Sequence, residues 1–296
     1  MNRREAGFLL LTSHLGNSGR KPLSASQLRI LSQRMQNMEK PEEDRELTWQ
    51  DLTRLGYNLE TAGHILSLLS DEQLLLYYLK RGQKAGCLPV SRINEQYPGI
   101  LRHRLGLDSP GCLWAKGDVS LLQTPAIALV GSRDLLEPNR EFARSVGVHA
   151  AQQGFTLVSG NARGADRTAQ EACLAAGGRV ISIVADELYK QPVHENILYV
   201  SEDGFAEPFS AQRAISRNRC IHALGQVVFV AQCTLGKGGT WDGTVKNLRK
   251  GMSPVLCFRD GSEASQELEQ LGAYLIECNQ IRNFSTLPQE DTLFDR

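Results

Sequence analysis

The sequence has no run of about 18 consecutive apolar residues, so it shows no candidate for a membrane-spanning helix. Near the start, the apolar residues 8–11 are followed directly by Thr12, Ser13 and His14. This apolar stretch is too short for the core of a signal peptide. We therefore expect a cytoplasmic protein with no membrane partner.

Closely paired cysteines are also absent. The seven cysteines stand at positions 87, 112, 173, 220, 233, 257 and 278, and none forms a Cys-x-x-Cys motif. Neither His194 nor His222 has a partner at metal-ligand spacing. The pattern favours isolated buried thiols in a reducing compartment over disulfides or zinc. We expect no metal and no cofactor.

An excess of charge of either sign is missing as well. The chain has 33 basic and 33 acidic residues, and residues 131–220 contain ten Lys or Arg against eleven Asp or Glu. Proteins that bind nucleic acid often carry a basic excess. Any anion-binding surface here must therefore come from local clustering of cations.

The first 95 residues are typical of a small helical domain. Apolar residues at helical spacing, with capping residues before them, predict four helices and a charged loop at 38–47. The predicted helices cover residues 27–37, 49–55, 59–69 and 71–83.

Residues 96–278 predict an α/β fold. After a turn-rich transition with a short strand at 113–115, strands and helices alternate, which indicates a Rossmann-like parallel sheet flanked by helices. The predicted strands cover 126–130, 155–158, 179–184, 227–231, 255–258 and 273–276. The predicted helices cover 139–153, 165–176, 215–224, 241–249 and 262–271. Residues 279–296 are polar, and we expect a poorly ordered tail.

Two loops that follow predicted strands are rich in glycine and arginine. Ligands of parallel sheets bind beyond the carboxyl ends of the strands, where these loops lie. In both loops glycine permits close backbone approach and arginine offers a bidentate phosphate contact. Neither loop matches a G-x-G-x-x-G or a G-x-x-x-x-G-K-[ST] motif, and simple capped turns remain the alternative. The candidate residues are Gly131, Ser132 and Arg133 in the first loop, and Ser159, Gly160, Arg163, Gly164 and Asp166 in the second.

A third loop, at 235–244, contains four glycines, two threonines and a lysine before a predicted helix. Backbone amides at such a helix start favour anions, although a flexible loop is the alternative. Its candidate residues are Lys237, Gly238, Gly239 and Thr240.

An arginine cluster follows two phenylalanines, Phe205 and Phe209. If residues 215–224 form a helix, Arg213 and Arg217 lie four positions apart and share a face. Aromatic rings beside cations suit single-stranded nucleic acid, since bases stack while arginine holds phosphate. The alternative is a solvated basic face with two core aromatics.

Five segments in this order resemble the DNA-processing protein A family, also called Smf. They are Tyr97-Pro98-Gly99 and its two following residues, 109–117, 127–133, 158–166 and 217–221. The resemblance implies a Rossmann-like core that binds single-stranded DNA without sequence preference, protects it and helps load a RecA-type recombinase. It also implies a homodimer. The pocket residues it implies are Gly131, Ser132, Arg133, Ser159, Gly160, Arg163, Gly164, Asp166, Arg217, Asn218 and Arg219.

The chain also departs from that family. Residues 185–192 replace its usual Gly-Leu-Asp stretch, and no C-terminal winged helix is visible. This indicates a divergent branch, and natural transformation, genome maintenance and defence against foreign DNA all stay open as pathways. The helical first 95 residues are compatible with the sterile-alpha-motif-like or helix-hairpin-helix-like domain of many members.

A second hypothesis is a nucleotide sensor or an enzyme. Phosphoribohydrolases of the same superfamily carry Pro-Gly-Gly-x-Gly-Thr-x-x-Glu, with Glu as the catalytic group. Here that Glu position falls on Gly243, so the acid is missing unless Asp242 replaces it. We therefore predict a protein that is not an enzyme, while a nucleotide-sensing pocket stays open. A third hypothesis is a structural partner of a helicase or nuclease.

Overall fold

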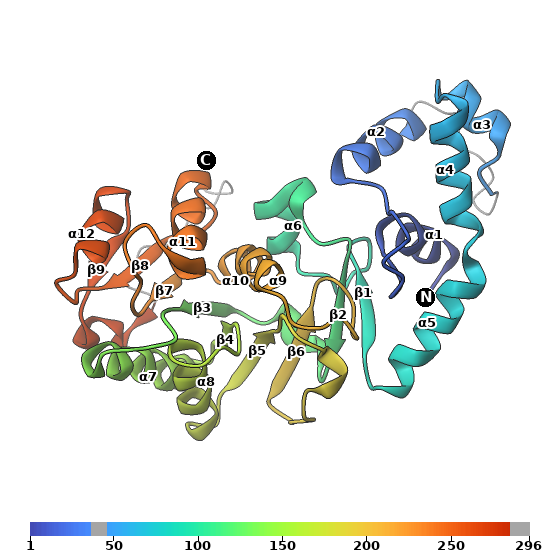
Figure 1. Cartoon of the computed structure of the whole chain (residues 1–296). Coiled ribbons are helices and arrows are strands. Elements are labelled where there is room, and N and C mark those ends of the chain that lie inside the picture. The colour runs from blue at the N-terminus through green and yellow to red at the C-terminus, as the bar shows by residue number, and fades with distance from the viewer. Residues whose placement is uncertain (37–45, 285–296) are drawn as a thin grey trace.

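The computed structural model describes residues 1–36 and 46–284, and within them the strands form one nine-stranded sheet (Figure 1). The strand order is β1-β2-β6-β5-β4-β3-β7-β8-β9. The seven strands from β6 to β9 in this order are parallel, which confirms the Rossmann-like prediction, and β1 and β2 extend the sheet in antiparallel fashion. The strands are β1 (Leu88–Ser91), β2 (Cys112–Lys116), β3 (Ala126–Val130), β4 (Thr156–Ser159), β5 (Arg179–Ile183), β6 (Ile197–Ser201), β7 (Val228–Val230), β8 (Val255–Phe258) and β9 (Tyr274–Ile276).

Helices cover both faces of the sheet, because side chains of the central strands alternate between two apolar clusters. In β3, Ile127 and Leu129 join the cluster under α7 (Glu137–Gln152) and α8 (Ala165–Ala175). Ala128 and Val130 join the cluster on the opposite face. The helices of that face are α6 (Gly99–Leu105), α10 (Asn218–Leu224), α11 (Gly238–Lys250) and α12 (Glu263–Gln270).

The four predicted N-terminal helices are confirmed, with shifted ends. Helix α1 (Arg3–Thr12) was not predicted from the sequence, although Asn2 and Glu5 form a capping box at its start. Most of the charged loop predicted at 38–47 lies outside the described residues. The confirmed helices are α2 (Ala25–Gln36), α3 (Trp49–Arg54), α4 (Leu59–Ser70) and α5 (Glu72–Lys84).

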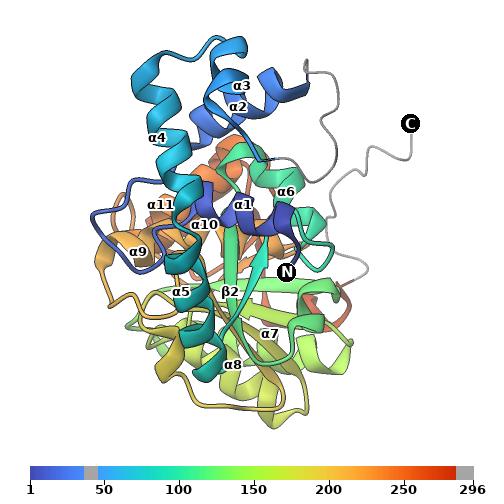
Figure 2. The same ribbon diagram turned by 90° about the vertical axis from the view of Figure 1, so that its right-hand side faces the viewer.

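The expected boundary at residue 95 needs correction, because the sheet begins before it. Strand β1 pairs with β2, and Leu9 of α1 and Tyr78 of α5 share an apolar cluster with Trp114 of β2. Figure 2 shows α1 and α5 lying against the sheet while α2 and α3 lie away from it. The more distant helices have a small core of their own, which includes Leu52 and Ile65.

The predicted poorly ordered tail also needs correction for its first residues. The chain forms a short 3-10 turn at Cys278–Arg282, and Ile281 and Phe284 are buried. The Phe284 ring lies 5.4 Å from the rings of both Phe155 and Phe229. Contacts with residues far away in sequence therefore order this polar segment up to residue 284, and the rest of the predicted tail is not described.

Three further features bear on the predictions. Six of the seven cysteines are buried, as expected for isolated thiols, and Cys278 is half-buried. Among residues 1–36 and 46–284, no helix is long and apolar enough to cross a membrane. The same residues contain no group of three or more His, Cys, Asp or Glu side chains that could hold a metal ion.

Candidate nucleic-acid interface

The three glycine-rich segments meet at one edge of the sheet, beyond the carboxyl ends of β3, β4 and β7. The Ser132 carbonyl accepts a hydrogen bond from the Ala165 amide at 3.1 Å, and the Gly131 carbonyl accepts one from Thr240 Oγ1 at 3.1 Å. The first loop is thus bonded to the other two. We call residues 131–133, 159–164 and 237–240 together the cradle.

Glycine is required where two of these loops touch. Gly164 has φ +88°, and a Cβ at this position would overlap the carbonyl oxygens of Ser132 and Arg133. Both the left-handed backbone and the close approach exclude other residues. Gly164 therefore sets how closely the second loop approaches the first.

The third segment is helical rather than a loop. Helix α11 begins at Gly238, so Gly238, Gly239 and Thr240 form its first turn and Lys237 is its N-cap. No side chain caps this end, and the first amides of a helix lack partners within the helix. The amide dipoles favour an anion there. The expected anion-binding segment keeps its place in the site, but it is rigid.

Arg217 reaches the cradle from below, in a turn that divides the single helix predicted at 215–224. This turn separates α9 (Ala211–Ser216) from α10, and Arg217 is only 6% exposed. Its Nη1 donates hydrogen bonds to the carbonyls of Gly160 and Ile183. A Cβ on Gly160 would overlap the guanidinium. Arg217 thus supports the second loop from beneath.

Asp166 is buried beside Arg217 in the first turn of α8. It accepts a hydrogen bond from the Ala162 amide at 3.2 Å. Burial raises the pKa of the Asp166 carboxyl, and the positive charge of Arg217 opposes that rise. Burial likewise lowers the pKa of Arg217, and Asp166 opposes this shift. The two buried charges therefore stabilise each other. Ser159 is fully buried at the end of β4, so it too lies beneath the loop.

Three cations of the cradle face solvent. Arg163 is exposed and forms an ion pair with the exposed Asp134 at 2.6 Å, which joins the second loop to the first. An exposed pair of this kind is worth about 0–1 kcal/mol, so a phosphate can displace the carboxylate. Arg133 and Lys237 are exposed, and neither is ion-paired with another described residue.

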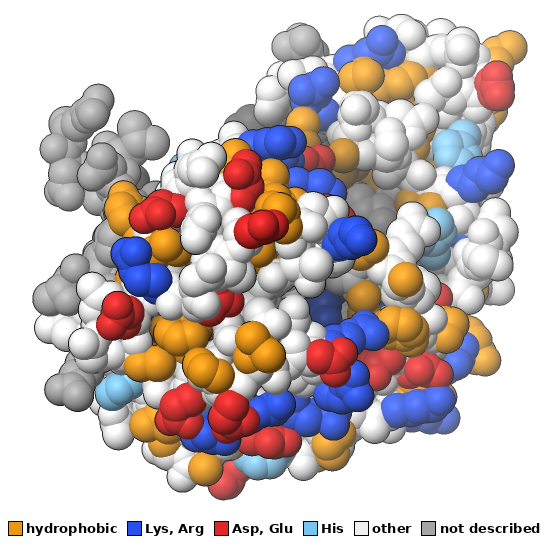
Figure 3. All heavy atoms as spheres, turned by 60° about the vertical axis from the view of Figure 1, so that its left-hand side comes forward, with side chains coloured by type: hydrophobic (Ala, Val, Ile, Leu, Met, Phe, Trp, Pro, Cys, Tyr) orange, Lys and Arg blue, Asp and Glu red, His pale blue; other side chains and the backbone are white. Residues whose placement is uncertain are grey.

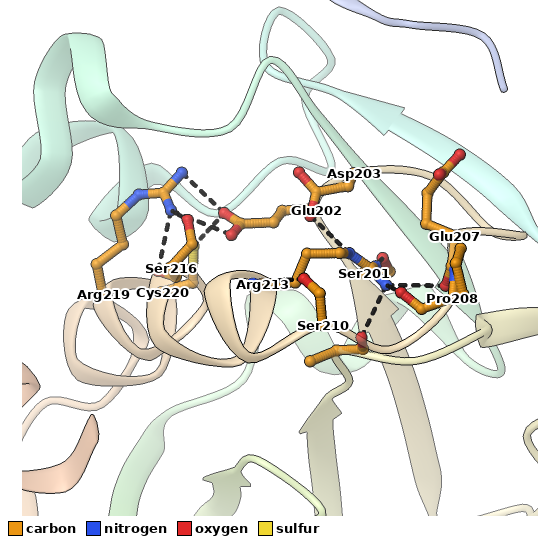
Figure 4. Close-up of polar contacts among 11 residues, drawn as sticks. Ser201, Glu202, Asp203, Glu207, Pro208, Ser210, Arg213, Ser216, Arg219 and Cys220 are labelled. Carbon is orange, nitrogen blue, oxygen red and sulfur yellow. Dashed lines mark hydrogen bonds and ion pairs between the residues drawn. The ribbon is translucent and has the colours of Figure 1, made fainter. Parts of the chain in front are cut away.

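The arginine cluster expected to hold phosphate is occupied by contacts within the protein, and the alternative of a solvated basic face is not found either. Arg219 binds Glu202 at 2.8 Å, and the Glu202 side chain is only 5% exposed (Figure 4). Arg213 binds Asp203 at 2.8 Å and donates to the Ala185 carbonyl at 2.7 Å. These guanidiniums hold the ends of β5 and β6 in place rather than facing a ligand.

Asn218, which lies between Arg217 and Arg219 in the sequence, also binds the protein's own backbone. Its Nδ2 donates to the Gly239 carbonyl at 2.9 Å, which ties α10 to the start of α11. Of the two phenylalanines, Phe205 is buried with its ring 4.6 Å from that of Tyr78. Phe209 is 55% exposed, so one aromatic ring of the expected pair is accessible.

The acidic partners of Arg163, Arg213 and Arg219 were not predicted from the sequence. Asp134, Glu202 and Asp203 each neutralise one of them, which agrees with the zero net charge of the chain. Figure 3 shows Lys and Arg side chains interspersed with Asp and Glu over the face it presents. The eleven acidic residues at 131–220, Asp134 directly after Arg133 among them, were the signal in the sequence.

The position that corresponds to the catalytic Glu of the phosphoribohydrolases is half-buried and lies against His222. A Cβ on Gly243 would lie 3.2 Å from His222 Nε2. His222 is fully buried, and burial lowers its pKa to about 4. Asp242 is exposed on α11. The His222 ring therefore limits the space for an acidic side chain at position 243.

Comparison with known proteins shows which family the chain belongs to. The model of the DNA recombination-mediator protein A family matches residues 90–284. DNA processing protein DprA of Streptococcus pneumoniae is 28% identical over 186 residues, or 58% of this chain and 66% of that protein. DNA processing protein DprA of Bacillus subtilis is 28% identical over 163 residues, or 51% of this chain and 54% of that protein. The chain thus matches between half and two-thirds of the length of these relatives.

Two solved structures are similar. DNA processing protein A of Streptococcus pneumoniae has a TM-score of 0.72 at 23% identity, over 95% of this chain and 97% of that chain. DNA processing protein A of Helicobacter pylori, solved to describe its single-stranded DNA binding mode, has a TM-score of 0.55 at 25% identity, over 67% of this chain and 94% of that chain. With the family model covering most of the sheet and the whole cradle, this chain belongs to the DNA recombination-mediator protein A family.

Proposed function

We propose that this chain binds single-stranded DNA at the cradle, without sequence preference. The observation that carries the proposal is the meeting of three glycine-rich segments at one sheet edge, with Arg133, Arg163 and Lys237 facing solvent around them. Phosphates suit the cations and the helix start. The DNA binding of the relative from Helicobacter pylori supports the same ligand.

The wider role follows from family membership. We propose that the chain protects single-stranded DNA and assists a RecA-type recombinase in DNA recombination or uptake, as a cytoplasmic homodimer. We also propose that α2, α3 and α4, which share a separate small core, form a sterile-alpha-motif-like unit. An enzyme of the phosphoribohydrolase type finds less support, because Gly243 offers no acid at the required place.

A salt series tests DNA binding directly. Oligo-dT and a duplex of equal length would be titrated by fluorescence anisotropy at several salt concentrations. The logarithm of the affinity for a single strand falls linearly with the logarithm of the salt concentration, with a slope of about −0.7 for each phosphate contact. Three solvent-facing cations therefore predict a slope near −2. Tighter binding of oligo-dT than of duplex is expected.

Opposite results would contradict the proposal. Equal affinity for duplex and single strand, or no dependence on salt, would contradict DNA binding at the cradle. Tight binding of a nucleoside monophosphate without affinity for oligo-dT would support a nucleotide sensor instead. Release of free base from that monophosphate would support the enzyme.

A further inference from the structure

Arg217 contacts the second loop of the cradle, yet its surroundings differ from those of a ligand-binding group. It is 6% exposed, whereas the Arg163 side chain is 72% exposed. Besides Asp166, the carboxylates of Asp186 and Glu202 act on its charge. A phosphate at this position would have to compete with these carboxylates.

The contacts of Arg217 show what it holds. The carbonyls that accept from Nη1 belong to Gly160, directly after β4, and to Ile183, the last residue of β5. One guanidinium therefore ties the ends of two adjacent strands together. The overlap that a Cβ on Gly160 would cause shows that the guanidinium packs directly against the backbone of this turn.

Asp166, beside Arg217, supports the next part of the turn. Its carboxylate accepts from the Ala162 amide and lies beside the Arg217 charge. Gly160 is thus held through Arg217, Ala162 is held through Asp166, and Asn161 between them has φ +59°. An uncommon backbone of this kind persists where its surroundings determine it.

We propose that Asp166 and Arg217 form a buried positioning pair that shapes the turn 160–162 for phosphate binding, and that Arg217 binds no phosphate of the strand itself. This inference rests on the proposed DNA binding at the cradle. It assigns the direct contacts to Arg133, Arg163, Lys237 and the backbone amides.

The substitution Asp166→Asn tests whether Asp166 positions the turn or only adds a negative charge near the phosphate site. The two possibilities predict opposite changes in DNA affinity. Removal of a negative charge beside a phosphate site should tighten DNA binding by simple electrostatic attraction. Loss of a positioning pair should weaken it, and we expect at least a tenfold lower affinity for oligo-dT, with an unchanged salt slope.

Arg217→Lys tests the other partner, because lysine keeps the charge and binds phosphate but cannot reproduce the fork of a guanidinium. We again expect at least a tenfold loss of affinity with an unchanged slope. Arg133→Gln is the matched control, since it removes an exposed cation, and its slope should shrink by about 0.7.

Thermal unfolding followed by circular dichroism would show that each variant is folded at the assay temperature. If Asp166→Asn and Arg217→Lys are unfolded at the assay temperature, Gly160→Ala is tested in their place, because it displaces the Arg217 guanidinium and keeps every charge. We expect it to bind at least tenfold more weakly with the same slope.

Two results would overturn the inference while DNA binding stands. One is an Asp166→Asn variant that binds oligo-dT as tightly as the unaltered chain or more tightly. The other is retained affinity in Arg217→Lys, or a slope that shrinks by about 0.7 in Gly160→Ala, either of which would make Arg217 a phosphate ligand. Absence of salt-dependent binding by the unaltered chain would instead remove the proposed function, and this inference with it.

Discussion

Gly164→Ala perturbs the contact between the first two loops of the cradle, and Gly177→Ala is its matched control. Both glycines have positive φ, +88° and +78°. A Cβ on Gly177 meets no atom within 4 Å, whereas a Cβ on Gly164 would overlap two backbone oxygens. The control therefore measures the cost of a positive φ in open space, which is about 1–2 kcal/mol for a residue other than glycine.

The structure sets the expected magnitudes. Gly177→Ala should lower the free energy of unfolding by about 1 kcal/mol and leave DNA affinity unchanged. Gly164→Ala carries at least this cost, because its ψ of −125° lies outside the left-handed helical region, plus about 1–3 kcal/mol for steric overlap, so we expect a loss of at least about 3 kcal/mol. Because the overlap separates the Ser132 carbonyl from the Ala165 amide, the affinity for oligo-dT should fall at least tenfold.

Urea-induced unfolding, followed by the fluorescence of the three tryptophans, would measure stability, and the salt series would measure affinity. Equal losses of stability in the two variants would refute the reasoning, because they would show that the loops are not in contact. Unchanged affinity in a folded Gly164→Ala variant would show that the spacing of the loops does not matter for the DNA.

Three further predictions concern other parts of the molecule. Phe284→Ala empties a buried site between two aromatic rings and should cost about 3–4 kcal/mol in urea unfolding; a loss below 1 kcal/mol would mean that this segment is not part of the core. Burial lowers the pKa of His222 from 6.5 to about 4, so its contribution to stability is complete above pH 6.5 and is lost as the pH falls towards 4. Between pH 7.5 and 5 the free energy of unfolding should fall by about 2 kcal/mol, and His222→Leu should remove this pH dependence. An unaltered pH profile of stability in the variant would contradict the assignment to His222. Asp134→Asn frees Arg163 and should raise the affinity for oligo-dT about two- to fivefold, with stability unchanged within about 0.5 kcal/mol; weaker binding would show that the ion pair helps to form the site.

The central part of the fold could be predicted from the sequence because its signals are local. Each central strand is a short apolar run, and each following helix has apolar residues at helical spacing, so β3, α8 and β8 were placed within a residue of their true ends. Strands β1 and β6 were missed. Strand β1 begins with Leu-Pro and lies at the edge of the sheet, so its sequence alternates poorly.

The meeting of the three loops was also predictable, since the carboxyl ends of parallel strands lie at one edge of the sheet. Every glycine-rich segment singled out in the sequence contributes to the cradle. The sequence determined this much by itself: the fold class, the edge that carries the site, and the positions where the backbone must approach closely.

The ion-pair partner and the burial of each arginine were decided only by tertiary structure. Arg219 pairs with Glu202 and Arg163 with Asp134, residues 17 and 29 positions away in sequence. Sequence spacing does not show which carboxylate a guanidinium will meet, because that depends on how strands and loops are placed in space. For the same physical reason, the burial of Arg217 beneath the turn, where it supports the site, follows from the packing of α10 against β3 and β4 and from nothing local to the residue.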